Sequence, residues 1–502
     1  MAQFVIAPRI SGQPAAKNLR RARTRAVAAQ FSGFADSAAA EATPELGALI
    51  VEGEKQEFES KQAELADDYI VEELKPRRPS LFTAAAASPP GMEQLPSGIG
   101  ATVELTATCE GTPLSGAMAS VSFVAFRGFV TTTFESTDSS GRAVFAYDPQ
   151  VWIPFTITVV PLSRAWAASS IVTGSSMKMS LPALPKNGPL GWWKRLLGVS
   201  GSDAQLGEGI RVGVVDSGVG PHPALAHVKK VGAFLNGAYL SEPDETLDVG
   251  QHGSHVTGII GARPAQGSGG FEGISPGAEL VAARIYPGGG KLPEPTGFAT
   301  NADIANAILA LSQDEKCDII NLSSSGPMRS ATETDRINAA FDSGTLLICA
   351  GGNGGGPPVL FPAAEPNVVS VAGLGMANTI PLGVLDVLTF PTQADRYSVT
   401  GLFSANFNSL GFEIKTSAPG VGIISTVPAT STEGAPYVAM SGTSMATPCV
   451  AAALAIILSR DPQYRTMPRN RERSIHAWRL LGSKLRPLGL SLPYQGYGMP
   501  IV

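Results

Sequence analysis

A chain of 502 residues exceeds the usual size of a single domain, so two or three domains are expected. Hydrophobic residues make up 44% of the chain and charged residues 16%, a globular balance that excludes a chain disordered throughout. The net charge of −5 excludes the strongly basic surface of a nucleic-acid-coating protein, so no nucleic-acid partner is expected.

The cysteine content and the N-terminal sequence indicate in which cellular compartment the protein is expected. The four cysteines are too few and too scattered for a disulfide framework, and no CxxC pair predicts a zinc site. We expect reduced, buried thiols, which favours an intracellular chain. The start MAQFVIAPRI lacks the basic and apolar parts of a signal peptide, and no segment has the roughly 18 uninterrupted apolar residues of a membrane span. We therefore expect a cytoplasmic location, with secretion by another route as the alternative.

Residues 1–82 form the first predicted region. The apolar run QFVIAP precedes a helix-like stretch over 15–30, and GALIVEG, a charged helix over 54–66 and YIVEELKP follow. This order predicts a small α+β region with a β-α-β-α-β pattern. Six basic residues and no acidic one stand within 9–25, which favours a solvated helix face over a transit peptide or a nucleic-acid-binding arm. Residues 83–98 are rich in Ala, Pro, Ser and Gly, which predicts a linker.

Residues 99–182 form the second predicted region, in which apolar and polar residues alternate. ATVELTATC and ASVSFVAF carry the alternation, TDSSGR is typical of a turn, and AVFAY resumes the pattern. Short strands at this spacing predict a small, immunoglobulin-like β-sandwich. LPALPKNGPLG predicts a second hinge. WWKRLLG then predicts a short amphipathic helix, for which packing onto the next domain is favoured over a membrane-surface role.

The third predicted region covers 190–502 and changes character again. Wholly apolar runs such as IRVGVVD, LVAARIY, DIINLS and TLLICAGG alternate with helix-like runs such as ADIANAILALSQ. Apolar strands separated by helices predict an α/β fold with a doubly wound, mostly parallel sheet covered on both faces. Functional groups of such sheets gather where the strands end.

An acidic residue and a histidine stand near the expected ends of the strands. IRVGVVD ends at Asp216, and no GxGxxG spacing of a dinucleotide site follows it. A carboxylate there fits a catalytic group, a helix cap or a nucleotide ligand. In GQHGSHVTGIIGA, His252 and His255 stand three apart without the HExxH pattern of a metal site. We expect His252 to act as a base and His255 to be a buried, hydrogen-bonded histidine.

Ser444 lies in SGTSMATPCVAAALAIIL, where small residues lead into an apolar helix. The unpaired backbone N–H groups at such a helix start can stabilise an oxyanion beside an activated hydroxyl, whereas the alternative is an ordinary helix cap. Pro448 is tolerated only near such a start. Asp216, His252 and Ser444 follow each other across 36 and then 192 residues, an order that differs from those of chymotrypsin and the α/β-hydrolases.

With these residues in place, the chain resembles the subtilases, the family of subtilisin-like serine proteases. The matching strings keep the family's order and spread over about 300 residues: VVDSGVGPHPAL, HGSHVTGIIGA, VAARIY, INLSSSG, AGGNGGG, SAPGVGIIST and SGTSMATPCVAAALA. The resemblance implies a serine endopeptidase with Asp216, His252 and Ser444 as its catalytic triad. It also implies that Asn353, in the Gly-rich loop after TLLICA, supplies the side-chain amide of the oxyanion hole.

The resemblance further implies how a peptide or protein substrate binds. In the family, an extended peptide pairs with the segment that matches Ser323, Ser324, Ser325 and Gly326. Relatives usually show a glycine where Ser325 stands. The serine is therefore expected to narrow the first specificity pocket and to disfavour a bulky residue before the cut bond.

The N-terminal region is similar to the inhibitory prodomain of the family, which assists folding and blocks the active-site cleft. In relatives this region usually abuts the catalytic domain, whereas here residues 99–182 intervene, so the place of any cut is open. No cofactor is expected, because Asp244, Glu245 and Asp248 indicate a solvated acidic loop more than a calcium site. Two rivals are a catalytically inactive subtilase fold that binds peptides and a nucleotide-binding α/β protein with an adhesion-type β-module.

Overall fold

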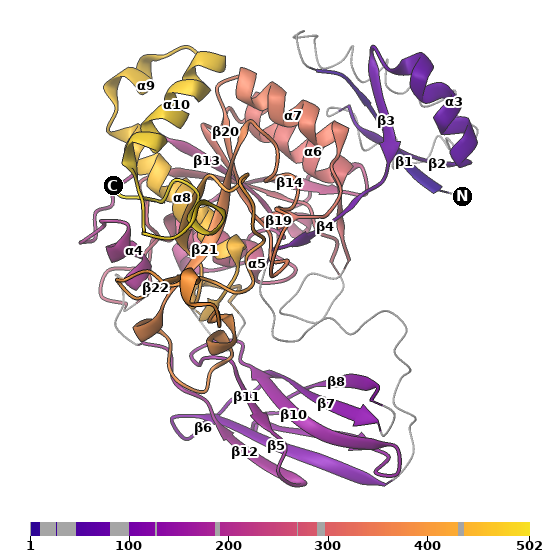
Figure 1. The fold of residues 1–502 in the computed structure, drawn as a ribbon, viewed down its shortest axis with the longest axis vertical. Coiled ribbons are helices and arrows are strands. Elements are labelled where there is room, and N and C mark those ends of the chain that lie inside the picture. Colours follow the sequence, from indigo (N-terminus) through magenta and orange to yellow (C-terminus); the bar gives the residue numbers. More distant parts are fainter. Residues whose placement is uncertain are drawn as a thin grey trace.

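The computed structural model describes residues 2–10, 27, 47–80, 100–125, 128–185, 191–268, 270–288, 297–429 and 436–502. Figure 1 shows an N-terminal sheet, a pair of stacked sheets and a large α/β body that follow each other along the chain. The predicted linker over 83–98 lies outside the described residues. So does the predicted helix over 15–30, apart from Val27, which is helical.

The N-terminal body is an antiparallel sheet with a helix on its face. Its elements are β1 (Ala2–Pro8), β2 (Leu49–Gly53), α3 (Lys55–Leu65), β3 (Tyr69–Glu73) and β4 (Pro76–Pro79). β1 lies between β2 and β3, and β4 leaves this sheet. The rings of Phe4 and Phe58 stack with centroids 3.8 Å apart, which holds α3 against the sheet.

The second body consists of two sheets around one hydrophobic core. Its strands are β5 (Ala101–Cys109), β6 (Thr112–Pro113), β7 (Met118–Ala125), β8 (Val130–Ser136), β9 (Arg142–Tyr147), β10 (Trp152–Val160), β11 (Ala168–Ile171) and β12 (Ser176–Ser180). One sheet has the order β11-β10-β7-β8, and the other has β12-β5-β6 with β9 on β5. Leu105, Phe123 and Ile157 meet in the core because alternate residues of each strand face inward. The immunoglobulin-like class of this region stays a prediction.

The large sheet of the third body is mostly parallel. Its strands are β13 (Arg211–Asp216), β14 (Lys229–Leu235), β15 (Ala238–Leu240), β16 (Glu279–Arg284), β18 (Ile319–Leu322), β20 (Leu346–Ala350), β21 (Val368–Met376), β22 (Leu402–Ser404) and β23 (Thr416–Pro419). The order is β15-β14-β16-β13-β18-β20-β21-β22, with β23 on β21. Only the pairs that β15 and β22 make are antiparallel among these described strands.

Helices cover both faces of this sheet, as the apolar strands predict. The helices are α4 (Trp192–Leu196), α5 (His252–Gly261), α6 (Asn301–Leu309), α7 (Ala331–Asp342), α8 (Thr443–Ser459), α9 (Pro462–Thr466), α10 (Arg471–Lys484) and α11 (Leu492–Gln495). Val214 of β13 joins the core that α5 and α8 share, whereas its neighbour Val215 joins the core under α6 and α7. The two buried cores lie on opposite faces of the sheet, so the side chains on both faces of the strands have to be apolar.

Short elements complete the third body. The short strands are β17 (Ala299–Thr300), β19 (Ser324–Ser325), β24 (Ile423–Thr426), β25 (Tyr437–Met440), β26 (Leu485–Arg486) and β27 (Met499–Pro500). The short helical turns are η1 (Pro223–Leu225), η2 (Pro243–Thr246), η3 (Ala310–Asp314), η4 (Ala377–Thr379), η5 (Leu385–Thr389) and η6 (Ala394–Arg396). Within the described ranges, no helix combines the length and the apolar character that crossing a bilayer requires.

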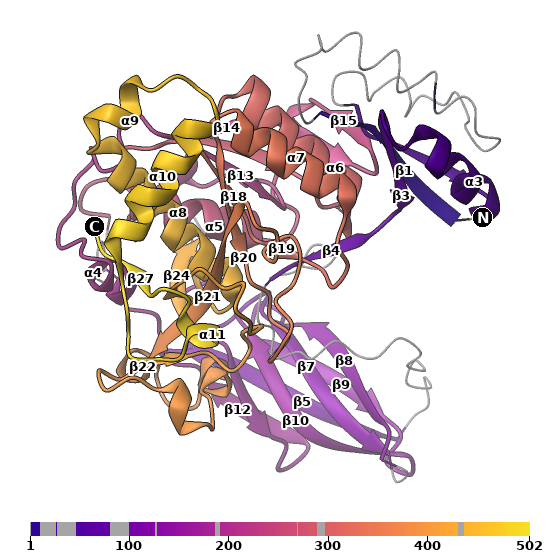
Figure 2. The same cartoon turned by 45° about the horizontal axis from the view of Figure 1, so that its top comes forward.

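The strand β4 joins the N-terminal body to the third body. Figure 2 shows it extending from the N-terminal sheet toward β19. It pairs antiparallel with β17 on one side and β19 on the other, with Arg77 opposite Ala299 and Arg78 opposite Ser325. A segment of the first region therefore becomes the middle strand of a small sheet on the third body.

Candidate active site

Asp216 and His252 meet at the end of the large sheet. β13 ends at Asp216 and α5 begins at His252. The Asp216 Oδ1 and His252 Nδ1 atoms are 2.6 Å apart, and both residues are buried. A carboxylate at this distance holds the imidazole ring in one orientation and stabilises it when it gains a proton. The structure thus brings two of the predicted catalytic residues together.

A serine and an acid hold these two residues in place. The Ser217 hydroxyl donates to Asp248 Oδ1 over 2.7 Å and accepts the Gly253 N–H over 2.8 Å. Asp248 Oδ2 accepts the Ser254 N–H over 2.7 Å. These bonds tie the loop after Asp216 to the first turn of α5, and their acceptor oxygens satisfy N–H groups that a helix start leaves without partners.

The expectation of a solvated acidic loop holds for Asp244, which is exposed, but not for Asp248, which is half-buried and accepts hydrogen bonds. Burial raises the pKa of its carboxyl, while hydrogen bonds from Ser254, Gly250 and Ser217 lower it. Within the described residues, no group of three or more His, Cys, Asp or Glu side chains is placed to hold a metal ion. Asp248 stands four residues before His252, and that position before a helix start was the available sign of a capping role.

His255 lies one turn further along α5 and faces away from Asp216. Its Nε2 lies 3.0 Å from the Ile423 carbonyl and 3.2 Å from the Val438 carbonyl. Its Nδ1 has no hydrogen-bond partner among the described residues. Burial lowers the pKa of His255 to about 3, so the ring is neutral near neutral pH. The structure agrees with the interpretation of His255 as a packed, buried histidine.

Ser444 is the second residue of α8 and is fully buried. Its hydroxyl donates to the Ser323 carbonyl over 2.9 Å, and the Ser323 hydroxyl donates back to the Ser444 carbonyl over 3.1 Å. The second bond compensates for Pro448, which has no N–H to offer to the carbonyl four residues earlier. α8 packs against α5, the helix that begins with His252. Pro448 therefore leaves the Ser444 carbonyl free to accept the hydroxyl of Ser323, the residue that follows β18.

Asn353 lies beside the start of α8, in the Gly-rich loop after β20. Its Oδ1 accepts the Thr443 N–H over 3.1 Å and the Thr443 hydroxyl over 2.8 Å. Because the Thr443 N–H can only donate, it requires an oxygen at this position, so the amide nitrogen points the other way. That Nδ2 is buried and has no hydrogen-bond partner in the described part of the chain. A buried donor of this kind can stabilise a negative oxygen placed next to it.

β4 places a peptide carbonyl at the start of α8. The Ser444 N–H donates to the Ser80 carbonyl over 3.1 Å, and the Ser80 N–H donates to the Ser323 carbonyl over 2.9 Å. Two serine hydroxyls, those of Ser80 and Ser325, lie 2.7 Å apart. Ser80 is therefore held on both sides of its backbone, with its carbonyl oxygen on a helix N–H group.

The predicted binding segment lines the path of β4. Ser324 and Ser325 pair with it in register, and Gly326 lies beside Arg77. A Cβ atom on Gly326 would approach Arg77 Nη1 to 2.8 Å and the Pro76 carbonyl oxygen to 2.9 Å. This glycine is consequently required for β4 to lie where it does.

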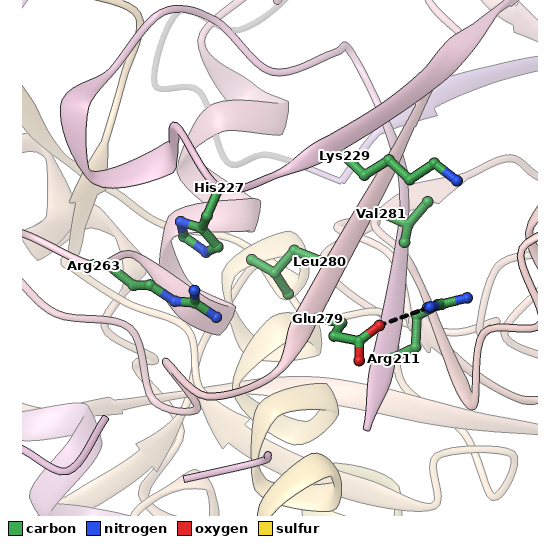
Figure 3. Close-up of a pocket in the computed structure, with 7 residues that line it drawn as sticks. All are labelled: Arg211, His227, Lys229, Arg263, Glu279, Leu280 and Val281. Atoms are coloured by element: carbon green, nitrogen blue, oxygen red, sulfur yellow. Dashed lines mark hydrogen bonds and ion pairs between the residues drawn. The ribbon is translucent and has the colours of Figure 1, made fainter. Parts of the chain in front are cut away.

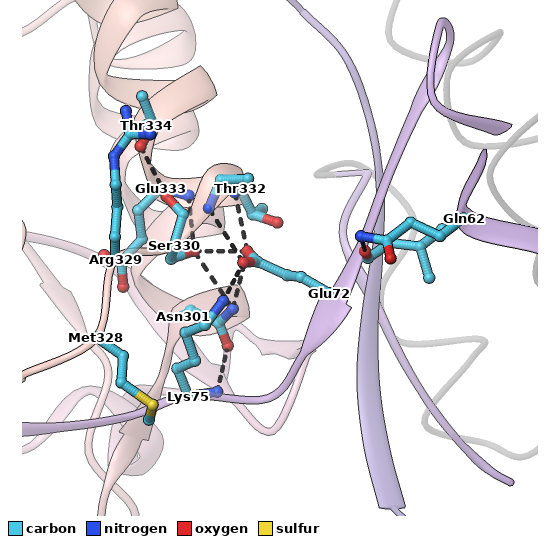
Figure 4. A network of polar contacts seen from close by, with 12 residues as sticks. Gln62, Glu72, Lys75, Asn301, Met328, Arg329, Ser330, Thr332, Glu333 and Thr334 are labelled. Atoms are coloured by element: carbon cyan, nitrogen blue, oxygen red, sulfur yellow. Dashed lines mark hydrogen bonds and ion pairs between the residues drawn. The ribbon is translucent and has the colours of Figure 1, made fainter. Parts of the chain in front are cut away.

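Glu72 fixes the N-terminal sheet on the third body (Figure 4). Its carboxylate accepts hydrogen bonds from the Ser330 hydroxyl (2.6 Å), the Thr332 N–H (2.9 Å) and the Ala331 N–H (3.0 Å) at the start of α7. The Asn301 amide donates to it over 3.1 Å. Burial alone would raise the pKa of Glu72, but hydrogen bonds from Lys75, Ser330 and Thr332 outweigh burial and hold that pKa below its usual value.

Further contacts join the same two bodies along α6 and α7. Arg336 donates to the Pro8 carbonyl over 3.0 Å, and Asp335 accepts the Ile10 N–H over 3.0 Å. An apolar cluster also crosses the interface and consists of Val5, Ala7, Ala48 and Ala302. Glu72 and these contacts escaped sequence reasoning because their partners lie more than 200 residues away along the chain.

A basic pocket of about 210 Å³ lies at the opposite edge of the large sheet (Figure 3). It is lined at the starts of β13, β14 and β16, so it is separated from Asp216 by the length of a strand. Arg211 pairs with Glu279, Lys229 pairs with Glu315, and Arg263 donates to backbone carbonyls. These three cations already have partners, and burial lowers the pKa of His227, which lines the same pocket, to about 4.

The comparisons with known proteins concern mainly this third body. The model of the family described as Subtilase family matches residues 207–480. Subtilisin Savinase from Lederbergia lenta is 30% identical over 284 residues, which cover 56% of this chain and 89% of that protein. Subtilisin amylosacchariticus from Bacillus subtilis subsp. amylosacchariticus is 33% identical over 269 residues, 52% of this chain and 59% of its own. A solved protease structure from Pseudoalteromonas arctica has 23% identity and a TM-score of 0.46, over 60% of this chain and 89% of that chain.

Proposed function

The chain belongs to the subtilase family and is a subtilisin-like serine endopeptidase, and we propose that it cuts peptide bonds through Asp216, His252 and Ser444 with Asn353 as oxyanion donor. The observation that carries this proposal is the Ser80 carbonyl on the Ser444 N–H, at the end of a strand that pairs with β19. A peptide strand already lies in the predicted substrate position. Its carbonyl lies beside the proposed nucleophile.

Asp216 and His252 are in contact, whereas the Ser444 hydroxyl donates to the Ser323 carbonyl, so the transfer of its proton to His252 is part of the proposal. Asp216 holds the Nδ1–H of His252, so that Nε2 is the nitrogen able to take the Ser444 proton. The resulting alkoxide attacks the peptide carbonyl carbon, and the negative charge moves to the carbonyl oxygen. The Ser444 N–H and the Asn353 Nδ2 stabilise that oxygen. His252 then gives its proton to the leaving amine, and water attacks the acyl-enzyme by the same route. The proposed reaction requires no cofactor.

The N-terminal region is proposed to be an inhibitor of its own active site. β4 fills the strand position of a substrate, and Glu72 and its neighbours fasten the sheet that carries β4. The bond next to Ser444 is the one between Ser80 and Leu81, and Leu81 lies outside the described residues. We place the maturation cut at this bond. Residues 99–182 would then stay at the N-terminal side of the mature enzyme, where they could recruit a protein substrate.

Two assays test the function. The wild-type chain is expected to hydrolyse casein and to react with a fluorophosphonate probe at Ser444, and the Ser444→Ala variant is expected to do neither. The inactive-scaffold rival predicts no labelling and no turnover in the wild type. Equal turnover in both proteins would show that Ser444 is not the nucleophile.

A further inference from the structure

We propose that this protease selects arginine at the fourth residue before the bond it cuts, and that the buried carboxylate of Glu333 recognises the arginine. The inference rests on the proposed function, because it takes β4 as the substrate strand. Counting back from the Ser80–Leu81 bond, Ser80 is the first residue and Arg77 is the fourth. Any peptide that pairs with β17 and β19 in this register places its fourth side chain where Arg77 lies.

The Arg77 side chain occupies an enclosed site. The residue has 0% of its surface exposed, which is rare for an arginine on a strand that joins two bodies. Its Nη2 donates to Glu333 Oε2 and to the Met328 carbonyl, over 2.9 Å in both cases. Its Nη1 donates to the Pro76 carbonyl over 3.2 Å. The guanidinium thus reaches one negative charge and two carbonyls through two separate nitrogens, whereas a lysine offers only one nitrogen.

The acidic partner is part of the protein framework. Glu333 lies in the first turn of α7, and its backbone N–H donates to the capping hydroxyl of Ser330 over 3.1 Å. It is 1% exposed, and its Oε1 has no hydrogen-bond partner among the described residues. Met328 and Glu333 come from the same segment, as Figure 4 shows. The start of α7 therefore fixes the backbone of Glu333 before any peptide arrives.

This arrangement means that efficient cleavage requires an arginine as the fourth residue before the cut bond. A buried carboxylate without a positive partner is unfavourable, so a peptide with an uncharged fourth residue would enclose Glu333 without compensation. Burial raises the pKa of Glu333, and the positive charge of Arg77 opposes that rise. The missing Cβ of Gly326 gives the guanidinium its space. Charge, shape and hydrogen bonds all favour arginine at this one position.

The neighbouring arginine provides an internal comparison. Arg78 is exposed, and its guanidinium lies 4.3 Å from the ring centroid of Phe298, which is itself 42% exposed. A contact of this kind at the surface contributes little to binding. The two adjacent arginines therefore differ in burial and in partner, and only Arg77 is expected to determine which peptides are cut.

The test uses processed wild-type enzyme, recovered from expression of the full chain and quantified by fluorophosphonate labelling. Peptides that span residues 76–83 are compared with their Arg77→Ala, Arg77→Lys and Arg78→Ala forms. We expect Arg77→Ala to lower kcat/KM at least about 100-fold, because the buried charge loses its partner. Arg77→Lys should lower it about 10-fold, and Arg78→Ala by less than about 3-fold.

A second arm changes the enzyme. With Glu333→Gln, kcat/KM for the wild-type peptide should fall and the preference for Arg77 over Ala should shrink at least about 10-fold. Asp342→Asn removes a negative charge from the far end of α7 without touching β4, and it should keep the wild-type preference. If a Glu333 variant does not fold, the peptide series on the wild-type enzyme still decides the question.

The outcomes separate the two levels of the proposal. Cleavage of all four peptides at similar rates by a labelled, active enzyme would overturn the arginine selection and leave the protease function standing. A chain that neither reacts with the probe nor cuts any peptide would overturn the proposed function and the selection together.

Discussion

Replacing Glu72 should weaken the binding of the N-terminal region to the active site. Glu72 accepts hydrogen bonds from the Ser330 hydroxyl, two backbone N–H groups of α7 and the Asn301 amide. The Glu72→Gln change keeps the size but removes the charge, and its NH2 group would face donors. On release both sides regain water, so the net loss is smaller than the sum of the bonds. We expect about 2–3 kcal/mol, or roughly a 30- to 150-fold larger population with β4 detached.

Trypsin provides the assay for this population. In a Ser444→Ala background the chain cannot cut itself. The bond between Arg77 and Arg78 lies in a strand paired on both sides, and the Arg77 side chain that trypsin has to bind is fully buried. The neighbouring Lys75 and Arg78 are each followed by proline, which trypsin disfavours. When β4 reattaches faster than trypsin cuts, the cleavage rate follows the detached fraction. Glu72→Gln should therefore speed cleavage after Arg77 roughly 30- to 150-fold.

The matched control is Glu59→Gln, which removes a negative charge from the exposed side of α3 and leaves the α7 contacts intact. Its cleavage rate should equal that of the Ser444→Ala background. If Glu72→Gln also leaves the rate unchanged, the contacts at the start of α7 do not hold β4 in the cleft and the reasoning fails.

Three further changes test other parts of the site. Asn353→Leu should lower kcat about 10²- to 10³-fold with little change in KM, which is the size of the effect when a subtilisin loses this donor. Steady-state kinetics would measure the change, and an unchanged kcat would exclude the amide from the oxyanion site. Ser325→Gly should raise kcat/KM for phenylalanine relative to serine before the cut bond by roughly 10-fold, in a peptide series, because the Ser325 hydroxyl contacts that of Ser80. His255 has a pKa of about 3 when folded and about 6.5 when unfolded, so the unfolded chain binds the extra proton and the free energy of unfolding should fall as pH drops through this range. Urea unfolding of His255→Gln should show a weaker pH dependence there, and an equal dependence would contradict this origin.

Much of the third body could be predicted from the sequence because its information is local. Wholly apolar runs of strand length predict a sheet buried on both faces, and the residues at their ends identify the edge where Asp216 and His252 meet. Ser444 could be placed because small residues and Pro448 mark the start of an apolar helix. In each case the deciding residues are neighbours in the chain.

The contacts of β4 could not be predicted for the opposite reason. Arg77 and Glu333 are 256 residues apart, and Glu72 and Ser330 are 258 apart. In the sequence, TETD is typical of a solvated helix start, and nothing near Glu333 signals that a strand covers it. Asp248 was misjudged similarly, since an acidic loop and a helix cap have the same composition. The surroundings of these acidic residues are set by segments that come together only in the folded chain, so the local sequence does not reveal them.

The position of the Ser80 carbonyl is the central claim, and the new N-terminus of the processed chain tests it most directly. N-terminal sequencing and intact mass of the purified wild-type protein should give a fragment that begins at Leu81, and the Ser444→Ala chain should stay uncut. A wild-type chain that remains whole, or one that is cut at another bond while Ser80–Leu81 stays intact, would contradict the account.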